Sequence, residues 1–176
     1  YVAFFFDRVA AAAAKAWDGR ARGSVAWGLG HAVTSQNRRA TYADGSSVMY
    51  GTTAKPEFLG LEGGEDHAVD MVFFLNPDRR PLATMIAVAC PAQVDEGLSR
   101  VHADFWGDVR DGLRQRFGEE FVVLGLCGPA GDLVPRPMLR KPAEARMEQM
   151  RKLSRRQEVA RRVIDAYEST WEVVQS

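Results

Sequence analysis

The amino-acid sequence predicts an α/β domain in which a mixed β-sheet is layered against helices. The first observation is that segments with helical and strand-like periodicity follow one another along the chain. The second is the run Phe-Val-Val-Leu-Gly-Leu-Cys at residues 121–127, which is typical of a buried strand. The third is size, because 176 residues with 46% hydrophobic and 26% charged content suit one domain with its own core. We expect a single domain over residues 1–176.

The N-terminal part combines a predicted helix, a predicted strand and a long irregular stretch. Residues 2–17 carry apolar side chains on one helical stripe, and Asp18-Gly19 ends that helix. Residues 21–33 alternate small and apolar side chains, which predicts a strand with several glycines. Residues 34–64 show no sustained period. We expect them to form an ordered lid or rim, because large apolar side chains within the stretch could hold it in place.

A hairpin and a capped helix are predicted in the middle of the chain. Residues 68–75 and 82–90 have strand patterns, and the turn residues at 76–80 lie between them. Asp104 can cap a helix that reaches Phe117.

The last third begins with the strand at 121–127, which we expect to be central and buried, followed by a loop over residues 128–136. A helix over residues 142–153 is expected to turn Ala143, Met147 and Met150 inward. Ser154 to Gln157 has the form of a capping box, which predicts the start of a final helix. The apolar face of that helix is formed by Val159, Val163, Tyr167, Trp171 and Val174.

Composition excludes some classes of function. The formal net charge is zero, which argues against a general binder of nucleic acid or anionic membranes. No stretch approaches the roughly 20 apolar residues of a transmembrane segment. An arginine cluster is interpreted as a solvated helix face; it comprises Arg151, Arg155, Arg156, Arg161 and Arg162. The chain begins without a methionine, and we expect it to be a segment of a longer protein, cut at both ends.

The metal-binding and nucleophilic side chains are few. Cys90 and Cys127 each follow an apolar run and are expected to be buried free thiols. The histidines form no His-x-x-x-His pair, so local spacing indicates no metal site. His67, which follows two acidic residues, could be oriented by a carboxylate to bind a metal, or it could be a solvated residue at the start of a strand. His31 lies at a strand end that contains glycines, and its role is likewise undecided between binding and structure.

The segment that ends the predicted central strand is the strongest candidate for a site. Glycines at 128 and 131 let the backbone turn sharply, and Asp132 follows at once. This segment could also be only a turn that Asp132 caps. We predict that Asp132 lines a crevice together with His31, Asn37 or His67, because polar residues at strand ends are the convergent candidates of this chain.

Several short motifs, taken in order, resemble those of the N-terminal catalytic domain of the neutral/alkaline (non-lysosomal) ceramidase family, and most closely its bacterial ceramidase-like branch. They cover roughly residues 21–150. The motifs are Asn37-Arg38-Arg39, Tyr42-Ala43-Asp44-Gly45, Met49-Tyr50-Gly51, Glu65-Asp66-His67, Ala89-Cys90-Pro91-Ala92-Gln93, Ala103-Asp104-Phe105-Trp106 and Ala130-Gly131-Asp132. The resemblance and the strand-end pattern together predict Asp132 as a catalytic residue. They also predict ligand-binding residues, namely Asn37, Arg38, Gly131, His31 and His67.

The resemblance implies a zinc-dependent amidase that cleaves an N-acylsphingosine, and it implies a secreted or periplasmic protein. The nucleophile of the family is a serine in a Gly-Asp-x-Ser-Pro turn, and this chain places Val134 at that position. Valine cannot attack a carbonyl, so serine-type chemistry is not expected here, and Val134→Ser is expected to restore it in an intact site. No zinc ligand of the family has a counterpart in this segment. Cys90, at the position of one such ligand, is a candidate replacement as a thiolate.

Three hypotheses remain from the sequence. The first is a ceramidase-like hydrolase that acts on an N-acyl lipid or a related small molecule through metal-bound water. The second is a non-catalytic relative that binds a ligand in the same crevice, which the loss of the serine favours. The third is an unrelated α/β structural domain.

Overall fold

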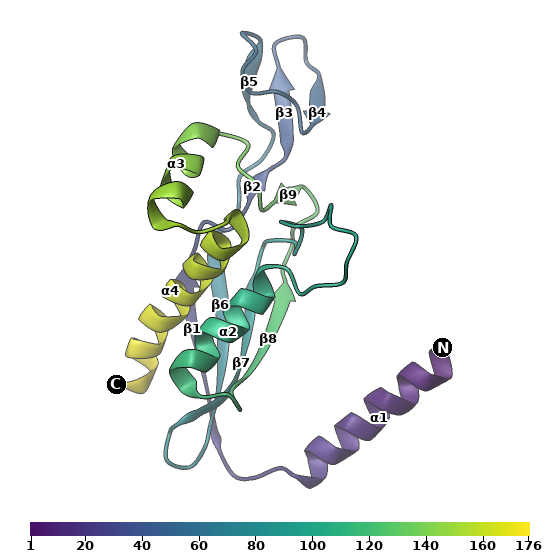
Figure 1. The fold of residues 1–176 in the computed structure, drawn as a ribbon, viewed down its shortest axis with the longest axis vertical. Coiled ribbons are helices and arrows are strands. Elements are labelled where there is room, and N and C mark those ends of the chain that lie inside the picture. Colours follow the sequence, from purple (N-terminus) through teal and green to yellow (C-terminus); the bar gives the residue numbers. More distant parts are fainter.

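A four-stranded mixed β-sheet forms the centre of the computed structural model, which describes all residues 1–176 (Figure 1). The strand order is β1 (Ser24–His31), β6 (Ala68–Leu75), β7 (Pro81–Val88) and β8 (Val122–Cys127). The first three strands pair antiparallel, whereas β7 and β8 run parallel. The predicted mixed sheet and the hairpin at 68–90 are therefore confirmed.

Two helices cover one face of this sheet and bury the core between the layers (Figure 1). They are α2 (Phe105–Phe117) and α4 (Arg155–Gln175). Phe73 of β6 is fully buried, and its ring centroid lies 5.2 Å from that of Tyr167 and 5.6 Å from that of Trp171. Alternate residues of each strand point toward the helices, which is the pattern of a sheet covered on one face.

The starts of both covering helices follow the predicted capping chemistry. The carboxylate of Asp104 accepts a hydrogen bond from the backbone N–H of Phe105 at 2.9 Å. Ser154 and Gln157 form a reciprocal capping box at the start of α4. The predicted apolar face of α4 is also confirmed, because four of its five members are buried and Val174 is partly buried against the core.

Residues 34–64, which were expected to form an ordered lid or rim without regular structure, contain short strands, so the expected lack of regular structure was wrong. β3 (Arg39–Tyr42) pairs antiparallel with both β4 (Ser47–Met49) and β5 (Phe58–Leu61), and these three strands project from one end of the molecule (Figure 1). β3 alternates, with Ala40 and Tyr42 buried, but four residues are too few to predict a strand from the sequence. A separate two-residue ladder joins β2 (Gln36–Asn37) to β9 (Leu133–Val134).

The strand at 121–127 is not central, which corrects the prediction. β8 lies at the edge of the sheet, and only Val123 among its residues is buried. The run of apolar residues in β8 does not reflect a central position. It arises because the sheet face turned away from α2 and α4 is apolar as well as the face that they cover. The same edge position leaves Cys127 exposed, whereas a buried thiol was expected.

The remaining helices lie outside the core. α1 (Val2–Asp18) forms as predicted, but all its residues are exposed and it extends away from the sheet (Figure 1). α3 (Lys141–Arg151) also buries no residue. Ala143 and Met150 were expected to point inward and are exposed, whereas Met147 is partly buried, because α3 packs on the end of α4 and not on the sheet.

Candidate functional site

The junction between the two small sheets brings Asn37 and Asp132 into direct contact. Asn37 lies on β2 opposite Leu133 of β9, and this pairing brings Asp132, the residue before Leu133, next to Asn37. The side-chain amide of Asn37 donates to Asp132 Oδ2 at 2.5 Å. Asn37 is fully buried, and its backbone N–H donates to Glu65 Oε1 at 3.0 Å. The side-chain oxygen Oδ1 of Asn37 accepts from the backbone N–H of Arg39 at 2.9 Å, so the orientation of the amide is fixed at both its nitrogen and its oxygen.

Arg38 connects the same junction to the preceding glycine. Its guanidinium donates to the carbonyl of Gly131 at 2.8 Å, and its backbone N–H donates to the carbonyl of Asp132 at 2.8 Å. The guanidinium also lies over the Tyr50 ring, 5.7 Å from its centroid. The half-buried Arg38 and the exposed Gly131 and Asp132 thus form a polar surface around the buried Asn37. We call these four residues the junction cluster.

The two predicted histidines do not join the junction cluster through any hydrogen bond or ion pair. His31 ends β1 and is exposed, and its backbone pairs with Ala68 at the start of β6. His67 is half-buried, and its carbonyl accepts from the backbone N–H of Ala32 at 2.9 Å. The two histidines occupy neighbouring strand ends, and the imidazole of His31 lines a different depression, described below.

Val134, the position that the resemblance assigns to a nucleophile, is fully buried on β9 opposite Gln36. The loop predicted over residues 128–136 is therefore interrupted by a short strand, and the side chain at 134 does not face solvent. A serine introduced there would place its hydroxyl inside the fold, so activation by Val134→Ser would require the site to open around it. The next polar side chain, Arg136, is exposed and pairs with Glu96 at 3.0 Å.

The described residues do not fit a zinc ion. No group of three or more His, Cys, Asp or Glu side chains converges anywhere in the chain. Cys90 is fully buried and its thiol donates to the carbonyl of Thr34 at 3.4 Å. Burial raises the pKa of the Cys90 thiol to about 12, so the thiolate that a metal requires is disfavoured. The chain's own residues therefore supply no metal centre by themselves.

The two cysteines should react very differently with a thiol reagent. We expect a maleimide to label Cys127 within minutes in the folded protein and to leave Cys90 unlabelled, because Cys127 is exposed and Cys90 is buried and protonated. Mass spectrometry of labelled peptides, native and in denaturant, measures this. Equal labelling of both residues in the native protein would contradict the buried position of Cys90.

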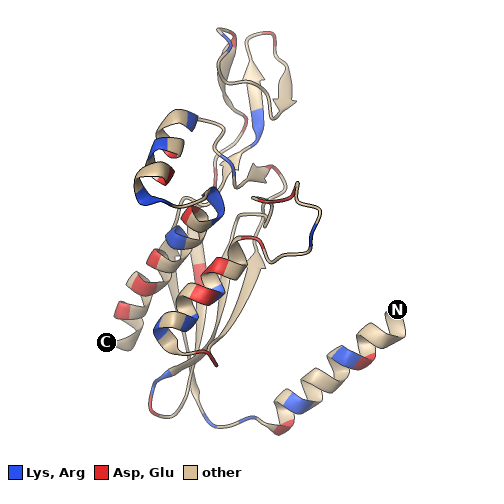
Figure 2. Ribbon diagram, in the orientation of Figure 1, with Lys and Arg blue, Asp and Glu red and all other residues tan.

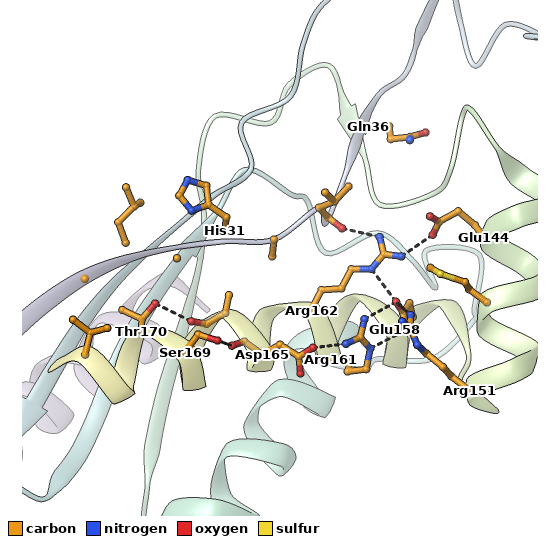
Figure 3. Close-up of a pocket in the computed structure, with 18 of the residues that line it drawn as sticks. His31, Gln36, Glu144, Arg151, Glu158, Arg161, Arg162, Asp165, Ser169 and Thr170 are labelled. Carbon is orange, nitrogen blue, oxygen red and sulfur yellow. Dashed lines mark hydrogen bonds and ion pairs between the residues drawn. The ribbon is translucent and has the colours of Figure 1, made fainter. Parts of the chain in front are cut away.

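The largest depression is a groove of about 950 Å³ between β1, α3 and α4 (Figure 3). One end is apolar and open, with Trp27 79% exposed beside Leu29 and Val173. The other end is charged, and Figure 3 shows Arg162, Glu158 and Glu144 linked to one another there. The groove is amphipathic along its length, which suits a ligand with an apolar chain and a polar head.

Glu158 organises the charged end of the groove. Its side chain is fully buried and accepts hydrogen bonds from Arg151 at 2.7 Å, Arg161 at 2.9 Å and Arg162 at 2.9 Å. The hydrogen bond from Arg161, together with that from Arg162, outweighs burial and lowers the pKa of Glu158 to about 2. Three of the five arginines of the cluster thus surround a buried carboxylate, whereas the sequence suggested a solvated helix face, and the other two pair with other acidic residues.

Sequence reasoning missed this groove and the role of Glu158. The one signal present was spacing, since Glu158 precedes Arg161 and Arg162 by three and four residues on the same helix. Spacing of this kind is common on solvated helices, and the partner from α3, Arg151, could not be paired with Glu158 from the sequence.

The fold, but not the sequence, has matches among known proteins. No protein-family model matches the chain, and no curated protein matches its sequence. The fold is similar to the neutral ceramidase from Pseudomonas aeruginosa, with a TM-score of 0.60 and 15% identity over 88% of this chain. It is also similar to a ceramidase complexed with C2, with a TM-score of 0.58 and 13% identity over 88%. The chain spans 23% of the length of either protein. The expected ceramidase-like fold is therefore confirmed.

Proposed function

We propose that this chain is the ligand-orienting part of a ceramidase-like hydrolase, whose substrate is an N-acyl lipid or a related amphiphile with an amide bond. The observation that carries the proposal is the junction cluster within a ceramidase-like fold. Asn37, Arg38 and Asp132 come from segments far apart in the sequence and meet at the ends of short strands, where polar side chains can reach a ligand.

The junction cluster offers complementary groups for the polar part of such a ligand. Asp132 Oδ2 is bonded to Asn37, and no intramolecular partner holds Oδ1 of the same exposed carboxylate. Oδ1 can therefore accept a hydrogen bond from an amide N–H or a hydroxyl group of the ligand. The Arg38 guanidinium lies beside it and can donate to a carbonyl oxygen. These residues bind and orient, and the buried Asn37 holds the carboxylate in a defined direction.

The junction cluster contains no serine or cysteine, and no metal-binding group lies in the described residues, so we assign the bond-breaking groups to other parts of the protein. If a zinc ion were held there, it would polarise the amide and activate water. A non-catalytic ligand-binding relative is the second candidate. Val134 at the nucleophile position and the lack of a metal-binding group favour it.

Hydrolysis assays on the full-length protein test the proposal. We expect a fluorescent N-acylsphingosine to be cleaved, cleavage to be abolished by a chelator, and a serine-directed phosphonate to leave the protein unlabelled. Asp132→Ala should lower kcat/KM by about tenfold or more, since it removes a charge-assisted hydrogen bond. Asp78→Ala, an exposed carboxylate in the β6–β7 turn, is the matched control and should leave kcat/KM unchanged.

The two candidates give different results in the same experiment. Binding of the lipid without cleavage, weakened by Asp132→Ala, supports the non-catalytic relative. Neither binding nor cleavage, or equal effects of both substitutions, contradicts the placement of the ligand at the junction cluster.

A further inference from the structure

The face of the main sheet that α2 and α4 leave uncovered is almost entirely apolar. Strand alternation places one set of side chains on this face, which we call the open face; it comprises Val25, Trp27, Leu29, Val72, Phe74, Met85, Val122, Leu124 and Leu126. Figure 2 shows the strands largely free of charged residues. Asp70 is the one acidic residue in this set of positions, opposite Leu29 in the β1–β6 ladder. Apolar sheet faces of this extent are normally covered.

The N-terminal helix presents a second uncovered apolar surface. Five large apolar residues of α1, namely Val2, Phe5, Phe6, Val9 and Trp17, lie on one helical stripe, and each is at least half exposed. The alanines at 13 and 16 continue the stripe. All residues of α1 are exposed, and Figure 1 shows the helix separated from the sheet. An isolated helix of this length is only marginally stable in water, so its stripe requires a partner.

The dimensions of α1 match those of the open face. Seventeen helical residues span about 25 Å, and the eight residues of β1 span about 26 Å. The connection over residues 19–23 has the length that usually joins a helix to an adjacent, oppositely directed strand.

We propose that α1 docks on the open face of its own chain and completes a three-layer α/β/α arrangement. The short connection holds α1 at a high local concentration beside this face, which favours its own helix over that of a second copy. Docking covers the apolar hollow of about 320 Å³ on the open face, which Trp27, Val72 and Leu126 help to line. Trp27 also lines the amphipathic groove, so a docked α1 forms a wall at the apolar end of that groove.

Cross-linking of engineered thiols in the full chain, in a Cys127→Ser background, tests this docking. Ala13 lies on the stripe at about the height of Val72, whereas Ala14 points to the opposite side of α1. With dibromobimane, which becomes fluorescent when it joins two thiols, we expect Ala13→Cys/Val72→Cys to react roughly tenfold faster than the matched Ala14→Cys/Val72→Cys. Peptide mass spectrometry then shows that the linked thiols belong to one chain.

A second test introduces a charge into the apolar stripe of α1, which should prevent docking. Val9→Glu should abolish the fluorescence of Ala13→Cys/Val72→Cys, whereas Ala11→Glu on the outer face should not, and circular dichroism should show both variants folded. Cross-linking between two chains would overturn the proposal and identify a second copy as the occupant. Equal rates for the Ala13 and Ala14 pairs, or cross-linking that survives Val9→Glu, would overturn it as well.

Discussion

Replacing Glu158 by glutamine is expected to lower the free energy of unfolding by about 3–5 kcal/mol. The Glu158 carboxylate is fully buried and accepts hydrogen bonds from three guanidinium groups, so its replacement removes the buried anion that these groups share. Urea-induced unfolding followed by far-UV circular dichroism measures the change. The matched control is Glu168→Gln on the same helix. Glu168 pairs with Arg116 at 3.3 Å in a partly exposed position, so its loss should cost less than about 1 kcal/mol.

The contribution of Glu158 should also depend on pH. Its pKa is lowered from 4.5 to about 2 in the folded protein, so the folded state binds this proton less tightly than the unfolded state. The stabilisation is therefore fully present above pH 4.5 and is lost as pH falls toward 2. The difference in unfolding free energy between the native protein and Glu158→Gln should shrink over that window. A difference that stays constant from pH 5 to about 2.5 would contradict the assigned pKa.

Gly125→Val is expected to destabilise the protein by about 3 kcal/mol. Gly125 lies on β8, and a β-carbon built there would overlap the indole of Trp106. Trp106 cannot retreat easily, because it is buried and packs on Phe105 with ring centroids 5.0 Å apart. Thermal and urea unfolding measure the loss. Gly60→Val is the control, because Gly60 also lies in a strand but has open space around it.

A second substitution separates crowding from a general effect of valine. In the Gly125→Val background, Trp106→Leu should recover part of the lost stability, since leucine vacates the space that the valine side chain needs. In the native background the same change should destabilise, because it removes buried aromatic surface. Additive losses in the double variant would show that the indole is not what excludes a side chain at Gly125.

The sequence predicted the larger elements because their signals are local. Periodic apolar residues, the Asp104 cap and the Ser154 capping box all act within a few residues of the chain. The short strands between residues 36 and 61 were missed because an alternation over two to four residues is too brief to distinguish a strand from a loop. The central position predicted for β8 was wrong for another reason. An apolar run is expected for a central strand, but a strand at the edge of a sheet has the same run when both faces of the sheet are apolar.

One part of the candidate site was predicted from the sequence and another part was not. Asn37, Arg38, Gly131 and Asp132 were proposed from motifs and meet at one junction. The buried carboxylate of Glu158 and its groove depend on side chains from two helices, and no pattern in either helix reveals the pairing.

The parallel pairing of β7 and β8 has a consequence for the order in which the chain folds. The β6–β7 hairpin closes over a short turn, and β1 then adds to it as a neighbour. β8 can join only after residues 89–121, including α2, have crossed over the sheet, because parallel strands need such a crossover. Because this crossover is much longer than the β6–β7 turn, we expect β8 to pair only after the hairpin has formed. Until β8 pairs, β7 is an edge strand whose free backbone groups can pair with a strand of another chain. Aggregation during refolding should therefore increase with protein concentration and with the time that β8 takes to pair.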